Sequence, residues 1–97
     1  MNDLVLRFLE YLELEKNKSP RTIANYSFYL RRFISFAKVD SPAQITPGLI
    51  RNFKIFLNRY KTKDGESLQK STINYHLIAL RSFLKYCLRE LRRAIKW

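Results

Sequence analysis

Apolar residues recur along this chain at the three- and four-residue spacing of amphipathic α-helices, and they predict four main helices. The first helix is expected over about residues 3–16, the second after Ser19, the third after Thr46, and the fourth from about Lys70 toward the C-terminus. No stretch alternates apolar and polar residues for long enough to indicate a β-strand. The pattern therefore predicts an all-α protein, folded as a compact bundle of four to five helices.

Each predicted helix carries one apolar stripe, which we expect to face the core. In the fourth helix the stripe is expected at Ile73, Leu77, Leu80, Leu84, Cys87, Leu88 and Leu91. The second and fourth helices also share a pattern: Thr22-Ile23 followed by Leu30-Arg31-x-Phe33 recurs 50 positions later as Thr72-Ile73 followed by Leu80-Arg81-x-Phe83. Amphipathic helices share such positions by chance, and two copies are too few for a stacked-repeat protein. The recurrence predicts two helices of similar design.

Proline, hydroxyl and glycine residues indicate the helix starts and the loops. All three prolines follow a hydroxyl residue, in Ser19-Pro20, Ser41-Pro42 and Thr46-Pro47. A serine or threonine at the N-cap accepts a hydrogen bond from a backbone N–H, and proline at the next position loses no helical bond. We therefore expect helix starts at these pairs, with Ser41 and Gln44 forming a capping box around as little as one turn. Residues 61–67 are expected to form a loop.

The chain is strongly basic, with 19 lysines and arginines, 8 aspartates and glutamates, and a net charge of +11. Residues 51–97 have a net charge of +9, whereas residues 1–50 have only +2. This asymmetry favours one basic surface and an anionic partner, although a solvated basic face gives the same composition. No apolar run reaches the ~18 residues of a membrane span, and no signal peptide is recognised. We expect a soluble, cytoplasmic protein that binds no membrane.

Catalytic and metal-binding chemistry is not indicated. The single histidine, His76, flanks the apolar stripe of the fourth helix and is expected to be a partly buried structural residue. The single cysteine, Cys87, is expected to be a buried, inert thiol. No cysteine–histidine spacing suits zinc, and both glycines are isolated, so no phosphate-binding glycine loop is present. We expect no catalytic residue, no metal and no cofactor in this chain.

The fourth helix combines the side chains that bind duplex DNA. An α-helix fits the major groove, where asparagine, arginine and serine read base edges while lysine and arginine hold phosphates. The polar side of the fourth helix carries Ser71, Asn74, Arg81, Lys85 and Arg89. Two other functions would use the same basic face. One is a helical protein-interaction module that binds an acidic partner, and the other is a free-standing transcription regulator, which needs a dimer face and a palindromic site.

Two segments resemble a known family. The run Ser19-Pro20-Arg21-Thr22-Ile23, continued by Tyr26, Leu30-Arg31 and Phe33, resembles the second helix of the N-terminal core-binding domain of tyrosine recombinases, the phage-integrase family. The run Ser71-Thr72-Ile73-Asn74, continued by Leu77, Ala79-Leu80-Arg81-Ser82-Phe83 and Tyr86, resembles its fourth helix. The resemblance extends over about residues 3–90. It departs from the family at Gln69-Lys70, where the family usually has Ser-Pro.

The resemblance implies a SAM-like helical domain that forms half of a C-shaped clamp around a recombination site, with its second and fourth helices facing the major groove. The DNA contacts that it implies are Arg21, Ser27, Arg31, Lys70, Ser71, Asn74, Tyr75 and Arg81, to which the basic face of the fourth helix adds Lys85. The implied partners are a double-stranded DNA recombination site, other recombinase copies assembled on that DNA, and a catalytic domain of the same protein.

The family's chemistry requires an arginine, a His-x-x-Arg pair and a nucleophilic tyrosine in that catalytic domain. After Glu90 the sequence offers only Leu91-Arg92-Arg93-Ala94-Ile95-Lys96-Trp97, with no His-x-x-Arg pair and no tyrosine, and His76 is followed three residues later by Ala79. We therefore expect residues 3–90 to be a noncatalytic DNA-binding domain from a tyrosine recombinase or integrase. Residues 91–97 are expected to be the helix end or the start of a linker to the catalytic domain, which is absent here.

Overall fold

The computed structural model describes residues 1–95, which form four α-helices and one short 3-10 turn. The elements are α1 (Asn2–Leu14), α2 (Pro20–Ala37), η1 (Pro42–Gln44), α3 (Pro47–Arg59) and α4 (Lys70–Ile95). No strand forms within the described residues, and an isolated bridge joins Lys61 to Ser67 at the ends of the expected loop. The all-α fold class is confirmed.

The last described residues belong to the last helix. Residues 91–95 belong to α4, while residues 96 and 97 of the expected linker segment lie outside the described range. Within residues 1–95, no helix combines the length and the apolar character needed to cross a bilayer.

α2 and α3 begin at the hydroxyl–proline pairs that the sequence indicates. Ser19 Oγ accepts a hydrogen bond from the backbone N–H of Thr22 at 3.2 Å, and Thr46 Oγ1 accepts one from Leu49 at 3.1 Å. η1 is a single turn, as expected, and the side chain of Gln44 closes its capping box. Each such cap typically contributes about 1 kcal/mol to stability, because it satisfies a backbone donor that has no helical partner.

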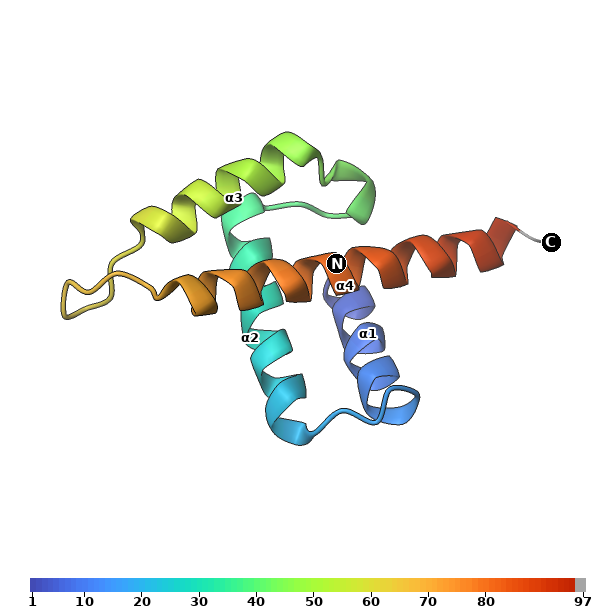
Figure 1. Ribbon diagram of the computed structural model, residues 1–97. Coiled ribbons are helices and arrows are strands. Elements are labelled where there is room, and N and C mark those ends of the chain that lie inside the picture. The colour runs from blue at the N-terminus through green and yellow to red at the C-terminus, as the bar shows by residue number, and fades with distance from the viewer. Residues whose placement is uncertain (96–97) are drawn as a thin grey trace.

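α4 is the longest helix, and it contacts each of the other three (Figure 1). α1 and α2 run side by side in opposite directions and cross α4 steeply, while α3 packs over the C-terminal end of α2 (Figure 1). Because α2 and α4 pack directly against each other, the two helices expected to contact DNA are held in one fixed relative orientation.

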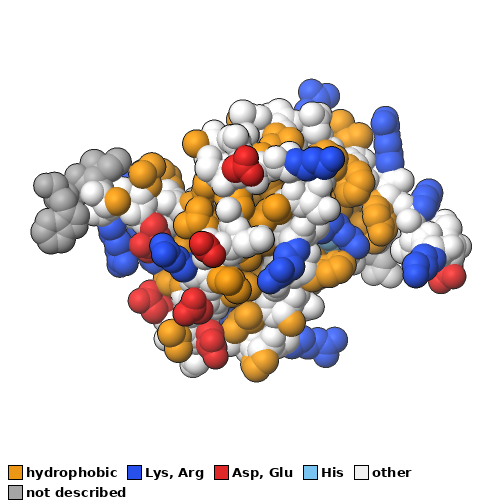
Figure 2. All heavy atoms as spheres, turned by 180° about the vertical axis from the view of Figure 1, so that it is seen from behind, with side chains coloured by type: hydrophobic (Ala, Val, Ile, Leu, Met, Phe, Trp, Pro, Cys, Tyr) orange, Lys and Arg blue, Asp and Glu red, His pale blue; other side chains and the backbone are white. Residues whose placement is uncertain are grey.

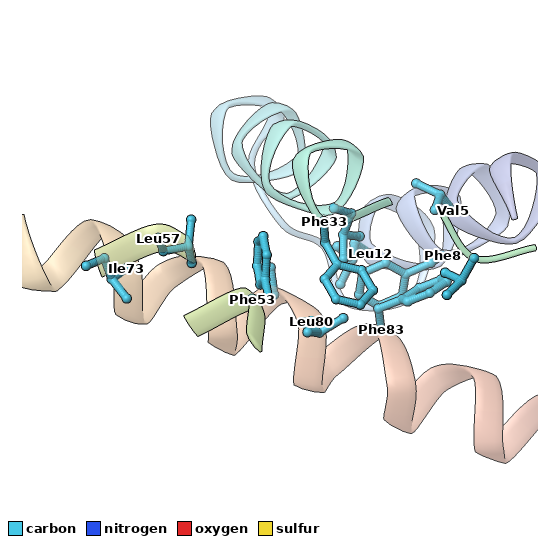
Figure 3. Packing of buried hydrophobic residues seen from close by; sticks show 12 residues of the cluster. Val5, Phe8, Leu12, Phe33, Phe53, Leu57, Ile73, Leu80 and Phe83 are labelled. Carbon is cyan, nitrogen blue, oxygen red and sulfur yellow. The ribbon is translucent and has the colours of Figure 1, made fainter. Parts of the chain in front are cut away.

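The core lies where α1, α2 and α3 meet α4 (Figure 3). The ring centroids of Phe8 and Phe83 lie 5.6 Å apart and join α1 to α4, and those of Phe33 and Phe53 lie 5.0 Å apart and join α2 to α3. Both pairs are edge-to-face, a geometry that adds about 0.5–1.5 kcal/mol to the burial of the rings. The buried apolar residues are Val5, Phe8, Leu12, Leu30, Phe33, Val39, Phe53, Leu57, Ile73, Ala79, Leu80 and Phe83.

The apolar stripe predicted for α4 was wrong at its C-terminal end. Leu88 and Leu91 are 49% and 56% exposed, whereas His76, Ala79 and Phe83 are buried. The reason is tertiary: the other helices pack against the N-terminal and middle parts of α4, and its C-terminal end extends past the bundle (Figure 1). Spacing along the sequence indicates which residues share a helix face, but not where the neighbouring helices stop.

Candidate nucleic-acid interface

α2 and α4 carry exposed positive charge with almost no acidic residues of their own. α2 contains no aspartate or glutamate, and α4 contains none before Glu90. Across residues 1–95, the one ion pair joins Arg93 to Glu90 at 3.5 Å. Acidic side chains instead gather over α1, at the lower left of Figure 2. Apart from Arg93, the cations of α2 and α4 therefore form no ion pair among the described residues, and they favour an anionic partner.

Six of the nine predicted DNA contacts lie on α4, and all six are exposed. They are Lys70, Ser71, Asn74, Tyr75, Arg81 and Lys85. Lys70, Asn74, Arg81 and Lys85 share one stripe, because their spacings are close to whole helical turns. At 1.5 Å per residue, the stripe from Lys70 to Lys85 is about 22 Å long. A major groove is about 12 Å wide, so this stripe is long enough to contact base edges and the phosphates beside them.

An apolar side chain lies within this polar stripe. Ile78, which is 46% exposed, follows Asn74 by one helical turn, and Tyr75 beside it is 55% exposed. Isolated exposed apolar residues are common on protein surfaces, and they need no special explanation. In a major groove, however, such a side chain can contact the methyl group of thymine, which is part of the base code.

The three predicted contacts on α2 are arranged differently. Arg21 and Arg31 are exposed, but Ser27 is half-buried, and its Oγ accepts a hydrogen bond from Arg31 Nε at 3.0 Å. Ser27 therefore orients Arg31 by accepting this hydrogen bond, and its own O–H can still donate. Among the described residues, no hydrogen bond or ion pair joins these three side chains to the α4 stripe. The structure places all nine predicted residues on α2 and α4, and their contacts with DNA remain predictions.

A cluster of polar and aromatic side chains fixes the junction of α2, α3 and α4. The Arg32 guanidinium lies between two rings, 4.6 Å from the centroid of Phe28 and 4.7 Å from that of Tyr60. His76 Nδ1 lies 2.7 Å from the Thr72 carbonyl oxygen, and its Nε2 lies 3.3 Å from Arg32 Nη1. Because a carbonyl only accepts and a guanidinium only donates, Nδ1 carries the proton and Nε2 accepts.

The same surroundings keep His76 neutral. Burial lowers its pKa from the usual 6.5, the hydrogen bond to Thr72 opposes this, and the positive charge of Arg32 lowers the pKa further. At 1% exposure, His76 is a structural residue that is more deeply buried than the sequence suggested. Sequence reasoning missed Arg32. The four-residue spacing from Phe28 indicates one of its ring contacts, but Tyr60 belongs to a different part of the chain.

The remaining reactive side chain is unsuited to nucleophilic chemistry. Burial, with a smaller effect of the Glu90 charge, raises the pKa of the Cys87 thiol to about 11, so the thiol stays protonated at neutral pH. Within residues 1–95, no three histidine, cysteine, aspartate or glutamate side chains lie close enough together to hold a metal ion.

Comparison with known proteins identifies relatives along almost the whole chain. Similar curated proteins include the tyrosine recombinase XerC of Bacillus subtilis, 34% identical over 90 residues, which cover 93% of this chain and 29% of that protein. The tyrosine recombinase XerC of Halalkalibacterium halodurans is 35% identical over 89% of this chain and 27% of its own length. That of Bacillus pumilus is 36% identical over 90% of this chain and 28% of its own length.

The chain thus spans less than a third of the length of these relatives. No solved structure is significantly similar to it. Residues 5–91 match the family described as "Phage integrase, N-terminal SAM-like domain", a range that includes α2, α3 and most of both α1 and α4. The chain therefore belongs to the SAM-like N-terminal domain family of phage integrases and tyrosine recombinases.

Proposed function

We propose that this chain binds duplex DNA through α2 and α4, as the N-terminal clamp domain of a site-specific tyrosine recombinase that acts in DNA integration or recombination. The observation that carries the proposal is the charge of these two helices. Both present exposed cations, α2 has no acidic residue, and the acidic residue of α4 lies near its C-terminal end. The reaction class in this proposal comes from the three relatives, which are all named tyrosine recombinases.

In this proposal the chain positions DNA and does not cleave it. Strand cleavage belongs to a catalytic domain of the full-length protein, which is the second partner that we propose. The third proposed partner is a set of further recombinase copies assembled on the same DNA site. The setting is the cytoplasm, where bacterial DNA lies. On α4, the cations Arg81 and Lys85 are assigned to phosphates, while Asn74 is assigned to a base edge because its amide both donates and accepts.

Fluorescence anisotropy of a labelled duplex, titrated with the chain at several salt concentrations, tests the proposal. Log affinity is expected to fall by about 0.9 per phosphate contact for each log unit of salt. Arg81→Gln and Lys85→Gln are expected to weaken binding to every sequence and to lower the slope by about one contact each. The control Lys54→Gln removes an exposed charge from α3 and is expected to leave the slope unchanged.

Base reading requires a preferred sequence, which can be enriched from a randomised duplex pool with the unmodified chain. Asn74→Ala is then expected to weaken binding to the enriched site by about 1–3 kcal/mol, with little effect on random DNA. Equal losses on both would remove the base-reading role of Asn74. A failure to bind any duplex at low salt would refute the DNA-binding function. If the chain instead binds polyglutamate saturably and does not bind duplex DNA, an acidic protein partner is favoured.

A further inference from the structure

A second basic feature lies beside the α2–α4 surface. The last turn of α1, the segment before α2 and the middle of α4 enclose a hollow of about 410 Å³, which we call the Arg89 pocket. Its cations are Lys16, Lys18, Lys85 and Arg89, and no acidic side chain among the described residues lines it. One water molecule occupies ~30 Å³ of liquid, so the pocket has room for a hydrated anion.

Arg89 has donors that the protein leaves without partners. Its Nη1 donates to Tyr11 Oη at 3.0 Å, and its guanidinium carbon lies 4.5 Å from the centroid of the Tyr11 ring. Its Nε and Nη2 are buried and have no hydrogen-bond partner within residues 1–95. Leaving a buried charged donor unpaired costs more than the ~1–3 kcal/mol of a neutral one, so Arg89 gains free energy if it turns these donors toward an anion in the pocket that it lines.

Two tyrosines separate the pocket from the nearest carboxylates. The rings of Tyr11 and Tyr86 pack with centroids 5.1 Å apart, and both line the Arg89 pocket. The same two rings also line a shallower hollow on their other side, which contains all the carboxylates of this region. Its charged residues are Arg7, Glu10, Glu15, Glu90 and Arg93. None of these carboxylates lines the Arg89 pocket or forms an ion pair with its cations, so the cations stay available to an anion.

The pocket is continuous with the proposed DNA surface. Lys85 belongs both to the exposed stripe of α4 and to the pocket wall. The site combines a planar guanidinium, flexible lysines and the hydroxyl of Ser82, which are donors suited to the oxygens of a phosphate. We propose that the Arg89 pocket binds a phosphate group. Given the proposed function, on which this step rests, the phosphate bound in the DNA complex is a backbone phosphodiester beside the α2–α4 surface.

Two exposed lysines allow the pocket to be tested without disturbing the core. The double variant Lys16→Gln/Lys18→Gln removes two of its cations, and both residues are exposed. The matched control Lys54→Gln/Lys63→Gln removes the same charge from exposed positions of α3 and the following loop, neither of which lines the pocket. In duplex anisotropy, the pocket variant is expected to lower the salt slope, relative to the control, by about 0.9 for each phosphate that it no longer binds.

A second measurement is independent of DNA. Thermal unfolding is followed in sodium phosphate and in sodium chloride at equal ionic strength. Phosphate also stabilises proteins non-specifically, and this part is common to all variants. A specific site adds a further rise in Tm that is expected in the unmodified chain and the control, and is expected to be clearly smaller in the pocket variant, which keeps Lys85 and Arg89.

The two measurements separate the possible outcomes. A lower salt slope identifies the ligand as a DNA phosphodiester, whereas a smaller phosphate-dependent rise in Tm with an unchanged salt slope identifies free phosphate. If the pocket variant matches the control in both measurements, the phosphate site is refuted. If no variant binds duplex, the proposed function fails, and the rise in Tm alone then decides whether the pocket binds phosphate.

Discussion

The contacts of Arg32 predict a specific loss of stability when this side chain is replaced. Arg32 is half-buried on α2, between the rings of Phe28 and Tyr60, and donates to His76 Nε2 at 3.3 Å. Because these partners come from α2, the end of α3 and α4, one side chain connects three parts of the fold. Arg32→Leu keeps an apolar stem of similar width but removes the guanidinium.

The magnitude follows from the interactions that the substitution removes. Each cation–π contact at a partly exposed site contributes about 0.5–1 kcal/mol. The Nε2 lone pair of buried His76 then has no donor, which costs about 1–3 kcal/mol. Since the leucine recovers part of the packing, we expect Arg32→Leu to lower the free energy of unfolding by about 2–3 kcal/mol. That is a large fraction of the roughly 5–15 kcal/mol typical of a domain.

Urea unfolding at pH 7.5, followed by circular dichroism, measures this loss. The matched control is Arg31→Leu, because Arg31 is the neighbouring residue, is exposed, and makes one hydrogen bond, to Ser27. The control is expected to cost less than about 0.5 kcal/mol, as exposed substitutions usually do. Arg32→Lys keeps the charge but not the planar fork, so an intermediate loss is expected.

The pKa of His76 gives a second readout of the same contact. The positive charge of Arg32 is one of two influences that lower this pKa, so Arg32→Leu is expected to raise it in an NMR titration of the imidazole. Equal, small losses of stability in the Arg31 and Arg32 variants would refute the reasoning. A large loss with an unchanged His76 pKa would show that the ring contacts stabilise the fold but that the contact with His76 does not form.

The remaining predictions concern pH, the core and a helix cap. Folded His76 has a pKa below 6.5, so the unfolded chain binds the proton more readily and stability should fall as the pH drops below about 6.5. In urea titrations from pH 5 to 8, His76 should change the free energy of unfolding by no more than about 1.4 kcal/mol per pH unit, and His76→Gln should remove this pH dependence. Phe83→Ala should cost about 3–5 kcal/mol, whereas Leu88→Ala, at an exposed position, should cost less than about 1 kcal/mol; similar losses would contradict the burial. Ser19→Ala should cost about 1 kcal/mol, and no loss would mean that α2 does not need its cap.

Features that depend on near neighbours in the sequence could be predicted without a structure. The caps at Ser19 and Thr46 were recognisable because the serine or threonine, the proline and the capped N–H group lie within four residues. The exposure of Asn74 and Arg81 was predicted in the same way, from their position opposite the apolar stripe of one helix. Local geometry is sufficient for such features, since the α-helix fixes which residues share a face.

Features that join distant segments could not be predicted. The hydrogen bond between Arg89 and Tyr11 spans 78 positions, and no residue pattern links the two. The exposure of Leu88 likewise depends on where the bundle ends, which the apolar spacing of α4 does not indicate. These contacts depend on how the helices cross. They also determine the place of Arg32, which sequence reasoning missed, and of Arg89, which the sequence put on the polar side of the helix but which is half-buried against Tyr11.

The pattern shared by α2 and α4 shows how one helix design supports two different environments. Two of its apolar positions are used alike, since Leu30, Leu80, Phe33 and Phe83 are all buried, whereas Ile23 is half-buried and Ile73 is buried. The two helices differ at positions 32 and 82, each of which directly precedes the shared phenylalanine. At 32 an arginine fills the space between two rings, whereas at 82 a serine lines the Arg89 pocket. A side chain as long as arginine at 82 would compete for that hollow with the lysines and with Arg89, so the small serine keeps it open to a ligand. The shared leucine and phenylalanine residues therefore build the core, and residues 32 and 82, which differ, determine whether the adjoining surface is filled by the protein or left for an anion.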